Sequence, residues 1–194
     1  MENWSQNSEQ EVILNHFKDF KGRFLDVGAF TGKQLSNTWA LSQSGWSGVC
    51  IEPSPSAFVG LMQNYKGNSN VILVNAAMSY NGAGLIDFAD SLGDAVSTTS
   101  VTHEELWNKV RSFQHIYVNT ITIREILRVF GEHYDFISLD VEGTNIEMLK
   151  TFPLELMNPS LICVEHEGRF QEVLEYCKGY EEIYRNGENI ILKK

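Results

Sequence analysis

Acidic side chains recur where the apolar runs of this chain end. The positions are Asp26, Glu52, Asp140, Glu142, Glu165 and Glu167. If the runs are parallel strands, their carboxyl ends meet at one edge of a sheet, which is where open α/β sheets bind ligands. Any one of these carboxylates could instead cap the helix that follows it, so the inference depends on several acids converging. Carboxylates gathered in one cleft stay ionised more easily when a positively charged or hydrogen-bond-donating ligand lies between them.

Glu52 is the most specific of these acids because it ends the second apolar run. A carboxylate at this place hydrogen-bonds both hydroxyls of a ribose in many nucleotide-binding sheets. The first run ends in Asp26-Val27-Gly28, and a glycine there lets a ligand approach the backbone closely because it carries no Cβ. The alternative for this glycine is a tight turn that serves the fold alone.

Two cofactors with a ribose suit this pattern. A dinucleotide needs a pyrophosphate site, usually built on G-x-G-x-x-G, but Phe30 occupies the middle glycine position in the stretch that ends at Gly32. S-adenosylmethionine has no phosphate, and its net positive charge suits an acidic strand edge. The sequence therefore favours S-adenosylmethionine. A dinucleotide-dependent oxidoreductase is the less favoured alternative.

The elements that must position these acids are expected to alternate along the chain. Continuous apolar runs predict strands covered on both faces, at 24–27, 48–53, 71–75, 82–90, 116–121, 135–143 and 160–168. Amphipathic segments predict helices at 9–19, 33–44, 54–66, 122–133, 145–152 and 170–178. Two further β-like runs flank Asn186-Gly187, a dipeptide that favours a type I′ hairpin turn. The fold class expected is a doubly wound, mostly parallel α/β sheet that ends in an antiparallel hairpin.

The length of 194 residues suits one domain, 1–194, and segment 82–115, which breaks the β-α rhythm, is expected to be a lid or substrate insertion. A net charge of −10 argues against nucleic acid as a partner. The first residues do not have the pattern of a signal peptide, and no apolar window has the length of a membrane helix, so neither secretion nor a membrane location is expected. Three scattered cysteines indicate free thiols in a reducing, cytoplasmic compartment.

Several stretches together resemble the FkbM family of S-adenosylmethionine-dependent methyltransferases. They are FLDVGAFTG with SNT after it, GWSGVCIEPSP, NAAMS, FISLDVEGTNIEMLK and CVEHEG. The resemblance covers roughly residues 22 to 170 in order, and it departs from the family at Phe30 and Thr31, where many relatives have a short polar pair. It implies the seven-stranded, Rossmann-like class I methyltransferase fold and O-methylation of a hydroxyl on a sugar, a glycan or a small metabolite.

The resemblance also implies roles for individual residues. Asp26 and the backbone from Gly28 through Ala29 to Gly32 would line the methionine part of the cofactor. Glu52, with Pro53 beside it, would hold the ribose. Asn75 and Ala76 would lie beside the adenine, and Asp140 and Glu142 would border the methyl group, with Asp140 a candidate partner for the cofactor's ammonium. These residues, by number, are Asp26, Gly28, Ala29, Gly32, Glu52, Pro53, Asn75, Ala76, Asp140 and Glu142.

An alcohol is a poor nucleophile, so a base beside it is expected to accelerate methyl transfer by about 10²–10⁴-fold. The candidates for this catalytic role are Asp140, Glu142 and His166. His166 could instead serve only to hydrogen-bond the backbone. A metal held by the same three residues is conceivable but not expected, because their spacing matches no dedicated metal motif. The different functional class is a non-catalytic module that binds S-adenosylmethionine without turnover.

The remaining candidate side chains are given structural roles by the sequence. His103, His115 and His133 lie in or near predicted loops and are expected at the surface. Trp107, inside the insertion, could contact a substrate, although core packing is the simpler expectation.

Overall fold

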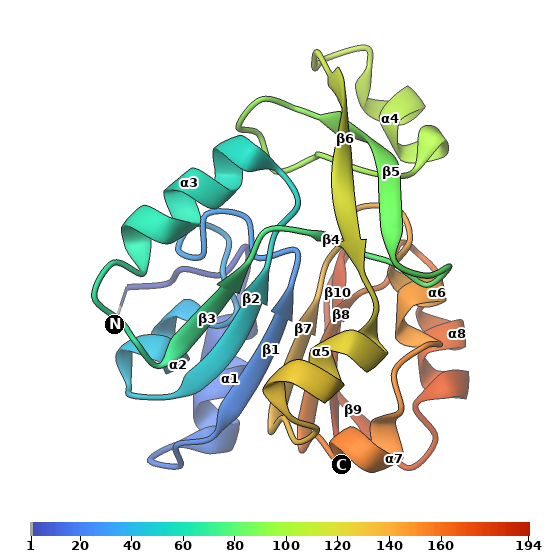
Figure 1. The fold of residues 1–194 in the computed structure, drawn as a ribbon. Helices are drawn as coiled ribbons and strands as arrows, with labels where there is room; N and C mark the ends of the chain where they lie inside the picture. Colours follow the sequence, from blue (N-terminus) through green and yellow to red (C-terminus); the bar gives the residue numbers. More distant parts are fainter. Residues whose placement is uncertain (1) are drawn as a thin grey trace.

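The computed structural model describes residues 2–194, and a seven-stranded sheet forms its centre (Figure 1). The strand order is β3-β2-β1-β7-β8-β10-β9. Its strands are β1 (Arg23–Val27), β2 (Ser47–Ile51), β3 (Val71–Val74), β7 (Phe136–Leu139), β8 (Leu161–Glu165), β9 (Glu181–Arg185) and β10 (Asn189–Lys193). The first five run parallel, and β10 is antiparallel to both β8 and β9. The predicted fold class is confirmed.

Helices cover both faces of this sheet, as continuous apolar strands require. Helices α1 (Glu9–Phe17), α2 (Trp39–Gln43) and α3 (Pro55–Asn64) pack on one face, and α5 (Ile123–Phe130), α6 (Asn145–Leu149), α7 (Leu154–Met157) and α8 (Phe170–Tyr176) pack on the other. Strand β1 contributes side chains to the core on both sides of the sheet, because neighbouring side chains of a strand point to opposite faces. Phe24 packs in the cluster with α1, α2 and α3, and Leu25 packs in the cluster with α5, α6, α7 and α8. The sheet therefore has little freedom to slip in register.

Two local predictions differ from the structure in an informative way. Helix α2 begins at Trp39 rather than at residue 33, because the Ser36 hydroxyl accepts hydrogen bonds from the N–H groups of Thr38 and Trp39 and so forms a turn before the helix. The hairpin is present, but its turn lies at Gly187 and Glu188, neither of which has a positive φ, so it is not of type I′. The Asn186 side chain fixes that turn by accepting from the N–H groups of Glu188 and Asn189.

The segment between β3 and α5 forms a second, smaller sheet above the main one (Figure 1). It has the order β4-β6-β5 and consists of β4 (Ala77–Met78), β5 (Gly84–Asp90) and β6 (Gln114–Ile121), with helix α4 (Val101–Trp107) between β5 and β6. Only strands β5 and β6, which are antiparallel over their whole length, correspond to strands expected from the sequence.

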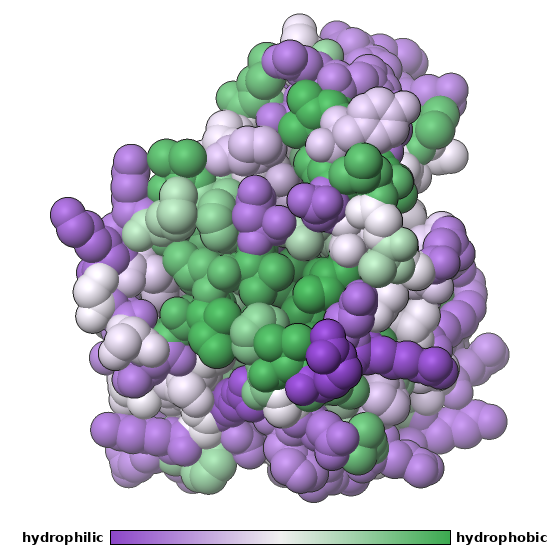
Figure 2. Space-filling view, in the orientation of Figure 1, coloured by the Kyte–Doolittle hydropathy of each residue, from purple (hydrophilic) through white to green (hydrophobic). Residues whose placement is uncertain are grey.

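One face of the molecule carries a broad apolar surface. Figure 2 shows it near the centre of the view, over the strands between α3 and α5. Exposed apolar side chains on these elements include Ile72 in β3, which is 40% exposed, and Val129 in α5, which is 54% exposed. The chain between β3 and α5 builds the small sheet instead of a further helix, so less of this face is covered. No helix in residues 2–194 is both long enough and apolar enough to cross a bilayer.

Candidate functional site

A cavity of about 350 Å³ lies at the carboxyl edge of the main sheet. Its floor is formed by the residues that follow β1, β2, β7 and β8, and its opposite wall by the small sheet's segment from Asp94 to Arg111. Seven of the predicted site residues line it: Asp26, Gly28, Ala29, Glu52, Pro53, Asp140 and Glu142. Glu165 and Asn37 join them. The sheet thus brings the strand-end acids together, as the parallel arrangement requires.

Glu52 is buried, at 6% exposed, and its carboxylate is held by the backbone. One oxygen accepts from the Ser54 N–H at 2.7 Å and the other from the Phe30 N–H at 2.8 Å. Burial raises the pKa of Glu52 to about 7, although these two hydrogen bonds act in the opposite direction. An ionised carboxylate has about four acceptor sites, so two remain for a ligand.

Asp26 is also buried, and its Oδ2 accepts from the Thr38 hydroxyl at 2.5 Å. Burial raises the pKa of Asp26 to about 6, partly offset by that hydrogen bond. The next residue but one, Gly28, has φ +86, and a Cβ there would lie 1.6 Å from the carbonyl oxygen of Asp140. The close approach that demands glycine is therefore that of the chain's own β7 loop, so the fold alone requires this residue.

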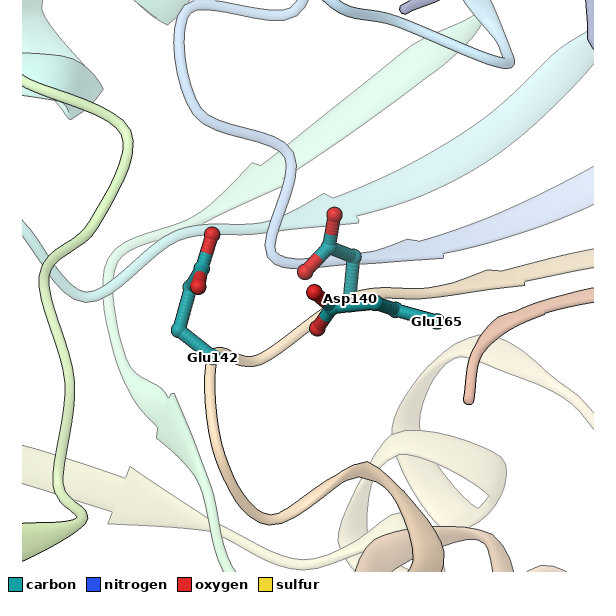
Figure 3. A group of neighbouring side chains, drawn as sticks. All are labelled: Asp140, Glu142 and Glu165. Carbon is teal, nitrogen blue, oxygen red and sulfur yellow. The ribbon is translucent and has the colours of Figure 1, made fainter. Parts of the chain in front are cut away.

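The acids at the ends of β7 and β8 form a tight group (Figure 3). Asp140, Glu142 and Glu165 each place one carboxylate oxygen within 4.8 Å of the other two. Burial, and then the like charge of a neighbour, raises the pKa of both Asp140 and Glu165. Asp140 Oδ1 is out of contact with solvent and has no hydrogen-bond partner within residues 2–194. A positively charged ligand group would satisfy that atom.

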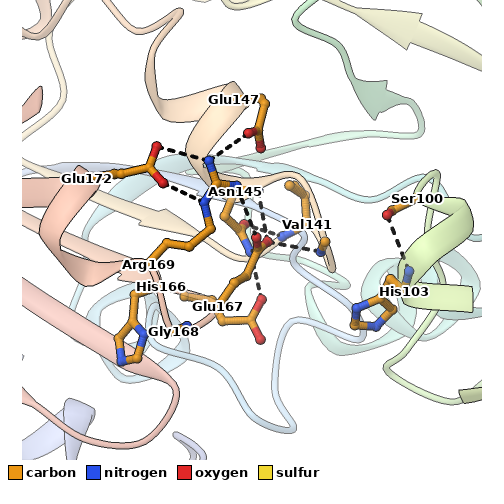
Figure 4. Close-up of polar contacts among 12 residues, drawn as sticks. Ser100, His103, Val141, Asn145, Glu147, His166, Glu167, Gly168, Arg169 and Glu172 are labelled. Carbon is orange, nitrogen blue, oxygen red and sulfur yellow. Dashed lines mark hydrogen bonds and ion pairs between the residues drawn. The ribbon is translucent and has the colours of Figure 1, made fainter. Parts of the chain in front are cut away.

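Asn145 fixes the position of these acids from the start of α6. It is fully buried, its Oδ1 accepts from the Val141 N–H at 2.7 Å, and its Nδ2 donates to Glu165 and to Glu167. Glu167 in turn accepts from the N–H groups of Gly143 and Asn145, and Figure 4 shows this network beside the ion pairs of Arg169. Glu167 therefore organises the loop and does not line the cavity.

His166 was predicted as a candidate base, but the structure does not bring it to the cavity. Its side chain is buried, Nδ1 accepts from the Gly168 N–H at 3.0 Å, and Nε2 lies 3.1 Å from the Asn186 carbonyl oxygen. Because an N–H must occupy the donor role toward that carbonyl, both ring nitrogens are in use. His166 therefore hydrogen-bonds the backbone, which is the alternative given for it in the sequence analysis. Because it does not reach the cavity with Asp140 and Glu142, these three residues do not form a metal site.

Three predicted cofactor residues also lie outside the cavity wall. Gly32 is buried against Leu61 and Tyr65, which a Cβ would strike at 2.3 and 2.5 Å. Asn75 is exposed and uses its amide to hold the carbonyl groups of Glu52 and Pro53. Ala76 is buried beside it. Asn75 therefore shapes the turn that carries Glu52.

His103 reaches the site from α4, although the sequence predicted it at the surface. Its Nε2 lies 2.9 Å from Glu142 Oε2, and the side chains are 15% and 20% exposed. The two atoms are close but not aligned as a hydrogen bond. Trp107, one helical turn on, lines the same cavity. No local pattern in the sequence marks His103, because only the placement of the small sheet brings it to Glu142.

Comparisons with known proteins agree with this geometry. The profile of the Methyltransferase FkbM domain matches residues 26–184. A comparison with curated proteins finds no significant match. Among solved structures, methyltransferase FkbM from Methylobacillus flagellatus is similar at 13% identity and a TM-score of 0.58, and the match covers 90% of this chain and 44% of that one. This chain thus spans less than half the length of that protein.

Two further structures share the fold. The O-methyltransferase from Bacillus cereus, solved in complex with SAH, is 15% identical with a TM-score of 0.53, and the match covers 99% of this chain and 83% of that chain. Precorrin-6y C5,15-methyltransferase from Geobacter metallireducens is 13% identical with a TM-score of 0.53, and the match covers 100% and 92% of the two chains. At these identities the likeness concerns the fold alone.

Proposed function

Because the chain belongs to the FkbM methyltransferase domain family, we propose that it transfers a methyl group from S-adenosylmethionine to a hydroxyl group of a sugar, a glycan or a small metabolite. The observation that carries this proposal is the buried Glu52, which follows β2 and lines the same cavity as Asp140, whose Oδ1 has no hydrogen-bond partner within residues 2–194. The first group suits a ribose diol and the second suits an ammonium.

The residues that line the cavity fit S-adenosylmethionine in charge and in hydrogen-bonding groups. Asp26, Glu52 and Asp140 line one cavity, and burial raises the pKa of each, so a ligand with positive charge relieves their mutual repulsion. Gly28, Ala29 and Pro53 supply backbone and apolar surface beside them. When bound, the cofactor supplies a methyl group that its sulfonium activates toward a nucleophile.

The small sheet, together with its connecting loops and α4, is proposed as the lid and acceptor-binding part, and it contains the insertion expected at 82–115. The Ser54 hydroxyl donates to Asp90 at 2.9 Å, and the Thr98 hydroxyl donates to the Glu142 carbonyl, so the insertion is tied to the strand ends. Arg111, which the insertion places at the cavity, already pairs with Asp94. An uncharged, hydroxyl-bearing acceptor suits such a wall better than an anion.

The test combines ligand protection with turnover. S-adenosylmethionine is expected to raise the melting temperature of the purified chain, since a ligand that binds only the folded state stabilises it. Labelled methyl from the same donor is then sought on a panel of hydroxylated acceptors. Protection by NADH but not by S-adenosylmethionine would overturn the proposal in favour of an oxidoreductase. Protection without transfer to any acceptor would favour a binding module.

A further inference from the structure

The contact between His103 and Glu142 joins the insertion to the loop that carries the strand-end acids. Both side chains line the cavity, and both are mostly buried. The other described contacts between these segments involve the backbone of Glu142 or packing on Gly143. The imidazole and the carboxylate are therefore the chemical groups that the two segments present to each other inside the site.

The backbone holds this pair in place from both sides. Glu142 has φ +53, a left-handed conformation that non-glycine residues seldom adopt and that is concentrated at functional sites. Gly143 follows at φ +103, and a Cβ there would lie 2.8 Å from Ser100 Cβ and 2.9 Å from His103 Cβ. The start of α4 thus rests directly on the loop. In Figure 4 the Ser100 hydroxyl accepts from the His103 N–H and caps the helix at the same point.

The two ring nitrogens of His103 have different surroundings. Nε2 is buried and 2.9 Å from the Glu142 carboxylate. Nδ1 has no hydrogen bond to any residue in 2–194 and is not among the buried unpartnered atoms, so it is open to a ligand. A carboxylate beside one imidazole nitrogen holds the proton there and leaves a lone pair on the other. In a catalytic triad the carboxylate orients the histidine through an aligned hydrogen bond. His103 and Glu142 are close enough for such a bond, and a small rotation of either side chain would align it.

We infer that His103 is the general base for the acceptor hydroxyl and that Glu142 is its positioning residue, an inference that rests on the proposed methyl transfer. His103 Nδ1 takes the proton as the acceptor O–H bond breaks. The acceptor oxygen forms a bond to the methyl carbon, and the carbon–sulfur bond breaks with its electron pair going to sulfur. The other charged groups on the cavity wall have partners or roles already described: Arg111 pairs with Asp94, Glu52 and Asp26 accept hydrogen bonds from the protein, and Asp140 is assigned to the cofactor's ammonium.

The first test reads the protonation of the ring without any acceptor. Nitrogen NMR on protein labelled at its five histidines should show His103 with a slowly exchanging Nε2–H and an unprotonated Nδ1. The Glu142→Ala variant should lose the slow exchange of that Nε2–H. A neutral His103 that carries its proton on Nδ1 would overturn the inference, because that nitrogen would then have no lone pair to accept the proton of the acceptor hydroxyl.

The second test reads turnover. With S-adenosylmethionine as donor and glucose, glycerol and phenol as acceptors, His103→Gln should lower kcat by about 10²–10⁴-fold, while its Kd for S-adenosylhomocysteine stays within about twofold. The matched control is His133→Gln, on the exposed loop before β7, which should leave both values unchanged. A His103→Gln variant that retains the wild-type kcat would contradict the inference.

The two levels of proposal fail in distinguishable ways. Wild-type protein that binds no S-adenosylhomocysteine defeats the proposed function itself. Wild-type protein that binds it but shows the wrong tautomer, or retains kcat in His103→Gln, defeats only the assignment of the base. If none of the three acceptors is methylated, the tautomer measurement still decides.

Discussion

At the scale of single residues, the site depends on carboxylates that burial makes reluctant to ionise. Ionising a buried carboxyl costs free energy, and the chain reduces this cost at Asp26 because the Thr38 hydroxyl donates a hydrogen bond to its carboxylate. A hydrogen bond to a charged group contributes about 1.5–3 kcal/mol, more than a neutral one. The helix start at 36–39 thus stabilises both α2 and the first acid of the site.

Thr38→Val should lower the free energy of unfolding by about 1–3 kcal/mol at pH 8, where Asp26 is ionised. The loss should be smaller at pH 5, below the pKa of about 6 that burial gives Asp26, because the protonated acid needs the donor less. Urea unfolding at the two pH values measures this, with exposed Thr102→Val as the control. A loss that is equal at both pH values would contradict the role given to the ionised form.

The sequence identified the acids but could not settle which side chains reach the cavity. Glu52, Asp26 and Asp140 follow from their position after a strand, since strand direction alone carries them to the edge. His166 follows the same rule yet is turned away, because the hairpin turn at Asn186 and the Gly168 N–H occupy its ring. His103 obeys no such rule and is brought in by the insertion alone.

At the scale of elements, continuous apolar runs predicted the parallel strands well, because burial on both faces leaves a clear signal. The small sheet was harder to foresee. Strand β4 has two residues and pairs with β6, which lies some forty residues later in the chain. Such long-range pairing leaves no local pattern. Helix α2 was predicted too long because the Ser36 hydroxyl accepts hydrogen bonds from the backbone N–H groups of Thr38 and Trp39 and so competes with the helix.

Gly143→Ala should loosen the contact between α4 and the loop after β7 that carries Asp140 and Glu142. Its Cβ would meet those of Ser100 and His103 at less than 3.0 Å, in addition to the backbone strain at φ +103. Hydrogen exchange in residues 98–107 should become faster. Gly67→Ala is the matched control, because Gly67 also has a positive φ, +86, but nothing within 4 Å of the added atom.

Both substitutions are expected to cost roughly 1–3 kcal/mol of stability through backbone strain. Only Gly143→Ala should change exchange in α4. If the two variants exchange alike in that helix, the insertion is not held by this contact, and the proposed lid would need another anchor.

At the scale of the whole molecule, the buried acids tie stability to pH. Burial raises the pKa of Asp26 to about 6 and of Glu52 to about 7, and it raises those of Asp140 and Glu165 as well. A carboxyl group in the unfolded chain titrates near pH 4. Between pH 4 and 7 these four groups therefore bind more protons in the folded state than in the unfolded state. The contribution of these groups to the free energy of unfolding is therefore fully present below about pH 4, and it is lost as pH rises through their pKa values in the folded state.

The free energy of unfolding should therefore fall by about 2 kcal/mol or more between pH 5 and 8, given about 1.4 kcal/mol for each pKa unit. His16, whose pKa is lowered by burial, acts in the opposite direction, whereas His115, whose pKa is raised by Asp87 and Glu104, acts in the same direction as the carboxyls. Urea titrations across this range test the sign. A flat or rising stability would mean that these carboxyls ionise as freely in the folded chain as in water.

The most direct measurement of the central claim is calorimetric titration with S-adenosylhomocysteine at pH 7.5. The account predicts micromolar affinity for the wild-type chain. Glu52→Ala should lose about 100-fold or more in affinity, in line with the 2–5 kcal/mol expected when one partner of a buried charged contact is removed. Glu155→Ala, whose side chain is exposed on α7, should bind as the wild-type chain does. Equal affinity in Glu52→Ala and the wild-type chain would contradict it.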